Sequence, residues 1–137
     1  MRIVRLSLPF FLLSIVFFLA ACNGSPSITV EPVELDLGNI SPTQPVEATV
    51  LVTNDGPGML EIADVRTSCG CTTATVESES LATGEETTMT ITFDPLAHEG
   101  LYGPLMRIIF IQSNDPDQPI VEIPMVVYVL SPEEVSQ

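Results

Sequence analysis

A two-residue alternation of apolar and polar side chains constrains the fold of this chain more than any other feature. It is clearest at residues 88–93, where Met89, Ile91 and Phe93 alternate with three threonines before Asp94 and a proline end the run. Successive side chains of a β-strand point to opposite faces, so this alternation is typical of a strand with one buried face. We therefore expect a strand here rather than an amphipathic helix.

The same pattern recurs through residues 30–131, where Pro, Gly, Asn and Asp interrupt it about every ten residues. We expect strands at or near residues 33–37, 46–53, 60–65, 73–76, 88–93, 105–111 and 120–129. Seven to eight short strands without a helical stripe predict an all-β fold, an immunoglobulin-like antiparallel β-sandwich.

Two of these strands carry more specific expectations. In the first, Val33, Leu35 and Leu37 should share the buried face, because they alternate with acidic residues. In the last, Pro124 should lie at an edge or a bulge, because proline cannot donate a hydrogen bond to a sheet ladder. The threonine-rich run 72–76 fits an exposed edge strand.

The N-terminal residues follow the order of an export signal that ends at a lipidation site. Two arginines in the first five positions precede an apolar stretch that leads to Leu19-Ala20-Ala21-Cys22. This order resembles a bacterial lipobox, in which a diacylglycerol joins the cysteine sulfur and a peptidase cuts before that cysteine. We expect a signal peptide at residues 1–21 and a lipoprotein whose acyl chains, such as palmitate, hold Cys22 to a membrane.

An uncleaved transmembrane helix is the alternative for this segment. The apolar stretch contains Ser7, Pro9 and Ser14 and is shorter than the roughly 20 residues that a spanning helix needs. The remaining chain then divides into the lipidated Cys22 with a short linker at residues 22–29, the β-domain at residues 30–131 and an acidic tail at residues 132–137. The linker is polar and should let the domain stand off the membrane.

Charge is distributed unevenly along the chain. All eighteen acidic residues lie at or beyond Glu31. Beyond the predicted signal peptide, the sequence has no lysine and two arginines, Arg66 and Arg107. Nucleic-acid binding needs a basic face that neutralises phosphates, so this composition excludes a nucleic-acid partner. An anionic lipid surface would repel the domain for the same electrostatic reason, so any membrane attachment must come from something other than charge.

Four motifs, taken in order, resemble those of the DUF1573 family. They are Pro32-Val33-Glu34-Leu35-Asp36-Leu37-Gly38, Asn54-Asp55-Gly56 with Leu60-Glu61-Ile62, Ser68-Cys69-Gly70-Cys71-Thr72, and Ser113-Asn114-Asp115-Pro116. The resemblance covers roughly residues 30–130, and its most specific element is the Cys-Gly-Cys. It implies an extracytoplasmic bacterial protein with an immunoglobulin-like domain related to the ASPM/SPD-2/Hydin type. The function of that family is unknown, so the resemblance implies a fold and a compartment rather than an activity.

Cys69 and Cys71 are the residues most able to carry chemistry. With Cys22 lipidated they remain as a pair, and an oxidising envelope favours a disulfide. Residues two apart in a regular strand have Cα atoms about 6.5 to 7 Å apart, at the upper limit for a disulfide. Gly70 can relieve this by adopting a tight turn. A bridge that closes so small a ring should be strained and easily reduced.

Three interpretations of the pair stay open. The cysteines can be a local staple or small apolar residues at a strand end. They can exchange disulfides, with Arg66 stabilising a thiolate. They can bind a soft metal ion, copper as Cu(I), with His98 or a methionine completing the site. Zinc is disfavoured because only one histidine is present.

The sequence favours binding over catalysis. It has no glycine-rich phosphate loop, no nucleophile-elbow serine and no second histidine, so we expect no enzyme. The acidic turn at residues 114–117 could hold Ca²⁺ weakly. We expect a lipid-anchored binding or structural module of the bacterial cell envelope, on the extracytoplasmic side of a membrane, with a protein partner that adds a strand at residues 72–76. A thiol-redox or copper-binding protein that uses Cys69 and Cys71 is the alternative.

Overall fold

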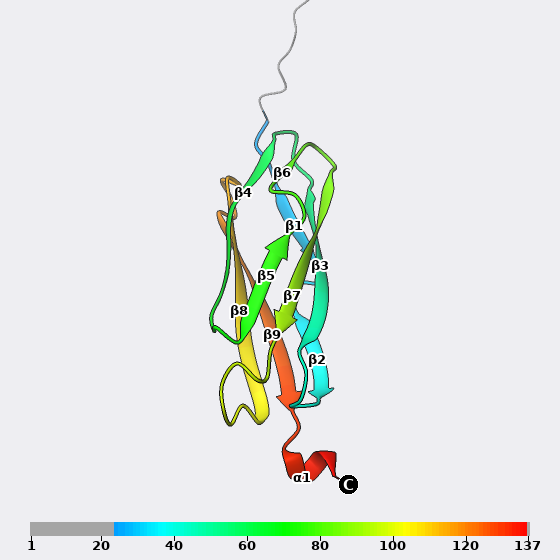
Figure 1. The fold of residues 1–137 in the computed structure, drawn as a ribbon. Helices are drawn as coiled ribbons and strands as arrows, with labels where there is room; N and C mark the ends of the chain where they lie inside the picture. Colours follow the sequence, from blue (N-terminus) through cyan, green and yellow to red (C-terminus); the bar gives the residue numbers. More distant parts are fainter. Residues whose placement is uncertain (1–23, 137) are drawn as a thin grey trace, which may run out of the picture.

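Two β-sheets packed face to face form the body of the structure (Figure 1). The structure, a computed structural model, describes residues 24–136. The first sheet has the order β1-β3-β7-β5 and is antiparallel throughout. Its strands are β1 (Ile28–Glu31), β3 (Val46–Asn54), β7 (Glu86–Phe93) and β5 (Thr72–Val76). The prediction of an all-β, immunoglobulin-like sandwich is thereby confirmed.

The second sheet has the order β2-β9-β8-β4-β6. Its strands are β2 (Leu35–Ile40), β9 (Ile120–Val129), β8 (Gly103–Ser113), β4 (Leu60–Thr67) and β6 (Ser80–Leu81). Strand β2 runs parallel to β9, whereas every other pair is antiparallel, so the expectation of a wholly antiparallel sandwich is wrong at this edge. The chain changes sheets between β1 and β2, at the cis peptide bond before Pro32.

The core lies between the sheets and is made by the inward side of each alternating strand. Its fully buried members include Val50, Val52, Met89, Ile91, Phe93, Ile109, Ile111, Ile123 and Met125. Each side chain of this size contributes about 1.5–3 kcal/mol when it leaves water. No disulfide bridges the two sheets among the described residues, so apolar packing holds the sandwich together.

Two of the specific expectations for the strands need correction. Val33 is 68% exposed and precedes β2, so the buried face begins only at Leu35. Pro124 lies in β9, between β2 and β8, rather than in an edge strand. It is tolerated because pairing with β2 begins one residue later, at Met125, which leaves that side of Pro124 without a partner strand.

The folded part begins earlier than predicted. Strand β1 starts at Ile28, inside the segment 22–29 expected to be a linker. The preceding residues pack against the turn after β3: Asp55 N donates to Ser27 O over 2.8 Å, and Gly58 N donates to Ser25 O over 3.3 Å. Residues 24–27 are therefore part of the domain and provide no flexible spacer. The predicted signal peptide and Cys22 lie outside the described residues.

The C-terminal segment contains the one helix of the described residues. The acidic tail contains a short helix, α1 (Pro132–Val135), with a capping box between Ser131 and Glu134. Figure 1 shows α1 at the end of the sandwich opposite to the start of β1. Within residues 24–136, no helix is long and apolar enough to span a membrane.

Candidate functional site

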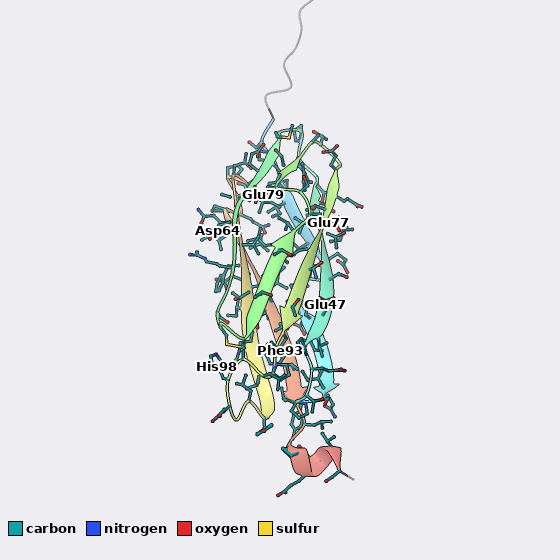
Figure 2. The ribbon with its side chains drawn as sticks, viewed as in Figure 1. Glu47, Asp64, Glu77, Glu79, Phe93 and His98 are labelled. Carbon is teal, nitrogen blue, oxygen red and sulfur yellow. A yellow bond between two sulfur atoms is a disulfide. The ribbon has the colours of Figure 1, made fainter. Side chains whose placement is uncertain are left out.

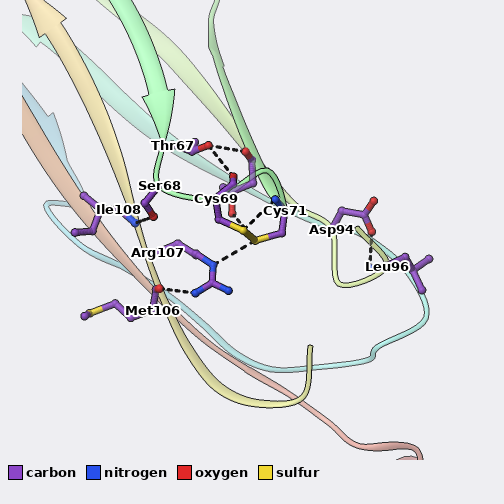
Figure 3. The surroundings of a disulfide bond; sticks show 10 residues. Thr67, Ser68, Cys69, Cys71, Asp94, Leu96, Met106, Arg107 and Ile108 are labelled. Atoms are coloured by element: carbon purple, nitrogen blue, oxygen red, sulfur yellow. Dashed lines mark hydrogen bonds between the residues drawn. A yellow bond between two sulfur atoms is a disulfide. The ribbon is translucent and has the colours of Figure 1, made fainter. Parts of the chain in front are cut away.

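A disulfide joins Cys69 and Cys71 in the turn between β4 and β5 (Figure 3). The turn is held by Thr67, whose hydroxyl donates to Cys69 O over 3.0 Å and to Thr72 O over 2.7 Å. Thr72 N also donates to Cys69 O over 3.1 Å. The two Cα atoms lie 5.2 Å apart, closer than in a regular strand. The turn therefore brings the two cysteines within the distance that a disulfide needs.

Gly70 contributes to this turn less than expected. Its backbone is not in the left-handed region, unlike that of Gly38, Gly84, Gly100 and Gly103. A Cβ built at Gly70 would meet nothing within 4 Å. The conformational freedom of glycine is therefore not what closes the bridge.

The two sulfur atoms have different surroundings. Cys71 is 1% exposed and belongs to the core, whereas Cys69 is half-buried and packs against the core from outside. Cys71 N donates to Cys69 Sγ over 3.1 Å. Arg107 Nε donates to Cys71 Sγ over 3.2 Å, and its Nη1 donates to Met106 O over 2.8 Å. The buried sulfur is thus the one beside a cation.

Arg107 is the residue of this site that the sequence patterns do not single out. It lies in β8 and alternates in phase with Leu105, Ile109 and Ile111, which face the core. An arginine in phase with buried positions of a strand was the signal that could have identified it. Arg107, rather than Arg66, donates a hydrogen bond to a sulfur, whereas Arg66 lies over the ring of Phe110, 5.8 Å from its centroid, and lines the hollow beside Cys69. Stabilisation of a thiolate by Arg66 stays a prediction.

The structure does not assemble the predicted copper site. His98 is exposed in the loop between β7 and β8, near the disulfide end of the molecule (Figure 2). Among residues 24–136, no three or more His, Cys, Asp or Glu side chains are grouped to hold a metal ion. In the oxidised pair each sulfur is bonded to the other rather than present as a thiolate. Copper binding by reduced Cys69 and Cys71 with His98 stays a prediction.

A groove runs from the disulfide along the side of the sandwich where β4 and β5 face each other. A hollow of about 310 Å³ is lined by residues that include Asp64, Val65, Ala74, Thr75 and Glu79. A second hollow of about 390 Å³ shares Val65 and Ala74 with the first and is lined at its far end by Cys69 and Gly70. We call the two hollows together the β4–β5 groove.

Both walls of this groove are strands without a neighbour on that side. Strand β5 is last in its sheet, which confirms the prediction that residues 72–76 form an edge. Strand β4 pairs with β6 only at Leu60 and Glu61, so the rest of its length has no partner strand on the side away from β8. Such edges present backbone N–H and C=O groups to an added strand. Figure 2 shows Asp64, Glu77 and Glu79 toward one end of this side, whereas the hollow beside the disulfide is lined by Arg66.

The opposite end of the sandwich is organised by Asn54, which is fully buried. Its Nδ2 donates to Gly58 O over 2.7 Å and to Leu81 O over 2.9 Å. Its Oδ1 accepts from Ser27 N over 3.2 Å and from Gly56 N over 3.0 Å. This side chain therefore ties the turn after β3 to the N-terminal segment and to β6.

Asp115, in the turn between β8 and β9, has a similar role at the same end. Its Oδ2 accepts from Ile28 N over 2.8 Å, and its Oδ1 accepts from Asp117 N over 2.8 Å and Gln118 N over 3.1 Å. Burial raises the pKa of this carboxyl, but the three backbone N–H donors outweigh burial and hold its pKa below the ordinary value. Because both oxygens already accept these bonds, the weak Ca²⁺ site considered at this turn gains no support.

Comparisons with known proteins agree with this architecture. A family model described as "Protein of unknown function (DUF1573)" matches residues 28–125. A protein of unknown function from Porphyromonas gingivalis W83 has a similar structure, with 22% identity and a TM-score of 0.71 over 82% of this chain and 51% of that chain. This chain thus spans about half the length of that protein. No curated protein matches the chain.

More distant structures share the fold alone. An ASH/PapD-like domain of human CEP192 is 10% identical, with a TM-score of 0.56 over 78% of this chain and 87% of that domain. The periplasmic chaperone SfaE is 10% identical, with a TM-score of 0.54 over 80% of this chain and 62% of that chain. Both support a PapD-like, immunoglobulin-like sandwich.

Proposed function

Since the chain belongs to the DUF1573 family, whose function is unknown, we propose that it is a binding module of the bacterial cell envelope. It takes up an extended segment of a partner protein along the β4–β5 groove. A lipid on Cys22 holds it to a membrane, on the extracytoplasmic side. The observation that carries the proposal is the pair of unpartnered strand edges that face each other across the groove.

Strand addition is the binding mode that this geometry supports best. An added strand can satisfy the free backbone groups of β5 and gain affinity from main-chain hydrogen bonds. The segment 72–76 contains three threonines and no charged residue, so no charge on it would repel a partner strand. The half-buried Val65, Ala74 and Val76 beside the groove offer apolar contacts for alternate side chains of the added segment.

Charge favours a basic partner segment. Asp64 and Glu79 line the hollow of about 310 Å³ at one end of the groove, Glu77 lies nearby, and the domain carries no lysine. Exposed ion pairs contribute little to affinity, but complementary charge speeds association and selects the partner. We therefore expect lysine or arginine side chains in the segment that binds.

The lipid would fix which end of the domain meets the membrane. Gly24 lies against Pro57 at the Asn54 end of the sandwich, and Cys22 precedes it by two residues. Under this proposal the Asn54 end faces the membrane and the disulfide end faces away. Labelled palmitate incorporated into the full chain but absent from Cys22→Ser would support the anchor, and labelling that survives this substitution would contradict it.

Site-specific photo-crosslinking in cells that make the full chain tests the groove. A photoreactive residue at Thr75, in β5, should give a discrete crosslinked product. The same residue at Thr29, in the opposite edge strand β1, is the matched control and should give none. Thr73→Pro should abolish the Thr75 product, because proline distorts the edge. Equal products from both edges would contradict strand addition at β5.

A further inference from the structure

The surroundings of Cys69 and Cys71 are those of a reactive pair rather than of a staple. A disulfide stabilises a fold mainly by restricting the unfolded chain, and the effect grows with the length of the loop that it closes. This bridge joins residues only two apart in sequence, so it restricts very little. Its sulfurs are also unequal, because one is half-buried beside the groove and the other is buried beside an arginine.

We propose that Cys69 and Cys71 form a thiol–disulfide exchange site that acts on thiols, in which Cys69 is the attacked sulfur and Cys71 is the leaving sulfur held by Arg107. This inference does not depend on strand addition at the groove.

Access selects Cys69 for attack. An incoming thiolate must reach one sulfur along the line of the S–S bond. Cys69 lines the hollow of about 390 Å³ at the end of the groove, whereas Cys71 does not line it and is 1% exposed. A thiol that enters this hollow therefore meets Cys69 first.

Arg107 selects Cys71 as the leaving group. In the oxidised state its Nε donates to a sulfur that carries no charge, and its other hydrogen-bond contact is the carbonyl of Met106. A thiolate at Cys71 would give this guanidinium an anionic partner 3.2 Å away. Without such a cation, a buried thiolate would be strongly disfavoured. The guanidinium is thus placed where negative charge appears when the disulfide opens.

The exchange balances with two equivalents of thiol. The first, as a thiolate, attacks Cys69 Sγ, so a mixed disulfide forms, the Cys69–Cys71 bond breaks and its electron pair goes to Cys71 Sγ. A second thiolate attacks the outer sulfur of the mixed disulfide and releases Cys69 as a thiolate, which faces Cys71 N at 3.1 Å. Two thiols are oxidised to a disulfide, and the chain is reduced by two electrons. The same steps in reverse let the reduced pair reduce a disulfide.

Trapping the mixed disulfide tests the direction of attack in the unmodified protein. The full chain, purified in a mild detergent, is exposed briefly to glutathione, quenched with acid and mapped by peptide mass. We expect the glutathione adduct on Cys69. An adduct mainly on Cys71, or equal amounts on both, would overturn the proposal.

Arginine variants test the leaving group. Arg107→Gln should slow reduction by glutathione about tenfold, since a leaving thiol without its cation leaves more slowly. Arg107→Lys should restore most of the rate, because it keeps a cation beside Cys71. An Arg107→Gln rate equal to the wild-type rate would overturn the role of Arg107.

A second measurement keeps this test decisive if Arg107→Gln fails to fold. In Cys69→Ala and Cys71→Ala each remaining thiol can be titrated by the ultraviolet absorbance of the thiolate. We expect Cys71 to ionise at lower pH than Cys69, because its cation lies beside it. The reverse order would overturn the proposal.

Discussion

The two ends of the sandwich use buried polar groups in opposite ways. At the Asn54 end, each polar atom of the side chain has a backbone partner of matching hydrogen-bond character, and both oxygens of Asp115 accept backbone N–H groups. At the disulfide end, the Arg107 guanidinium donates to a neutral sulfur. The first arrangement is complete in the state that the structure describes. At the disulfide end, Arg107 gains an anionic partner only when a thiolate forms at Cys71. The Asn54 end is therefore a structural network, whereas the disulfide end has the arrangement of a chemical site.

The largest expected effect comes from breaking the complete network at Asn54. Asn54→Ala removes four hydrogen bonds and leaves their backbone partners without the side chain that satisfied them. We expect the free energy of unfolding to fall by about 3 kcal/mol or more, a large part of the stability of a domain this size. Urea unfolding of the full chain in detergent measures this.

Asn114→Ala is the matched control for Asn54. Asn114 is exposed and makes two side-chain hydrogen bonds, to Glu61 N and Met59 O, so its removal should cost about 1 kcal/mol. Equal losses at Asn54 and Asn114 would show that burial of the network is not what stabilises this end.

Asp115 offers a smaller effect with a distinct pH dependence. Asp115→Asn replaces one accepting oxygen by an N–H₂ group, and we expect a loss of about 2 kcal/mol near neutral pH. Since the pKa of Asp115 is lowered in the folded state, its contribution is present above the pKa of the unfolded carboxyl. It is lost as the pH falls through the lower, folded pKa. The stabilities of wild type and variant should therefore converge in acid, and a gap that persists there would contradict the role of the charge.

These network residues were visible in the sequence, but their role was not. The turn signals at Asn54-Asp55-Gly56 and Asn114-Asp115-Pro116 correctly predicted breaks between strands. Composition alone cannot show that the side chains of these turns bond to segments far away, such as Ile28 and Leu81. Local patterns report backbone turns, whereas a contact across 87 positions depends on how the sheets pack.

The fold was largely predictable because it rests on a local period. Alternation located the strands, and the threonine-rich edge at residues 72–76 followed from composition. The start of the domain is not predictable in this way, because the polar residues 24–27 lack a strand pattern although they bond to the turn after β3. The tolerance of Pro124 in an inner strand depends on where β2 begins to pair, which the sequence of β9 does not contain.

The candidate site was also predictable only in part, because its residues come from segments that are far apart in the sequence. The Cys-Gly-Cys motif identifies the sulfurs, but nothing in the sequence near the motif points to Arg107. Arg107 is 36 positions from Cys71 in the sequence. It lies in β8, next to β4, and its side chain reaches Cys71 from there. Its phase with buried residues in β8 indicated an inward side chain, and only the packing of the sheets shows that Cys71 lies opposite.

Reduction of the Cys69–Cys71 disulfide should lower the free energy of unfolding less than Asn54→Ala does. The chain-entropy model gives a contribution of at most about 1–2 kcal/mol for a loop this short. We therefore expect the reduced chain to remain folded, with unfolding in urea shifted only slightly. Hydrogen exchange at residues 72–76 offers a second readout of whether β5 stays in place. Unfolding on reduction would show that the bond is a staple and would weaken the contrast between the two ends.

The smallest expected effect on the free energy of unfolding is that of Gly70→Ala. This variant also tests whether a flexible residue between the cysteines is needed for their reactivity. Gly70 is exposed, its backbone is not left-handed and a Cβ there would meet nothing within 4 Å. Gly70→Ala should therefore be neutral or stabilise the fold by about 0.4–1 kcal/mol, because alanine restricts the unfolded chain. Gly84→Ala is the matched control and should destabilise, since Gly84 has a φ of 76°. If Gly70→Ala also left the glutathione reduction rate unchanged, reactivity would rest on the unequal surroundings of the two sulfurs rather than on a flexible residue between them.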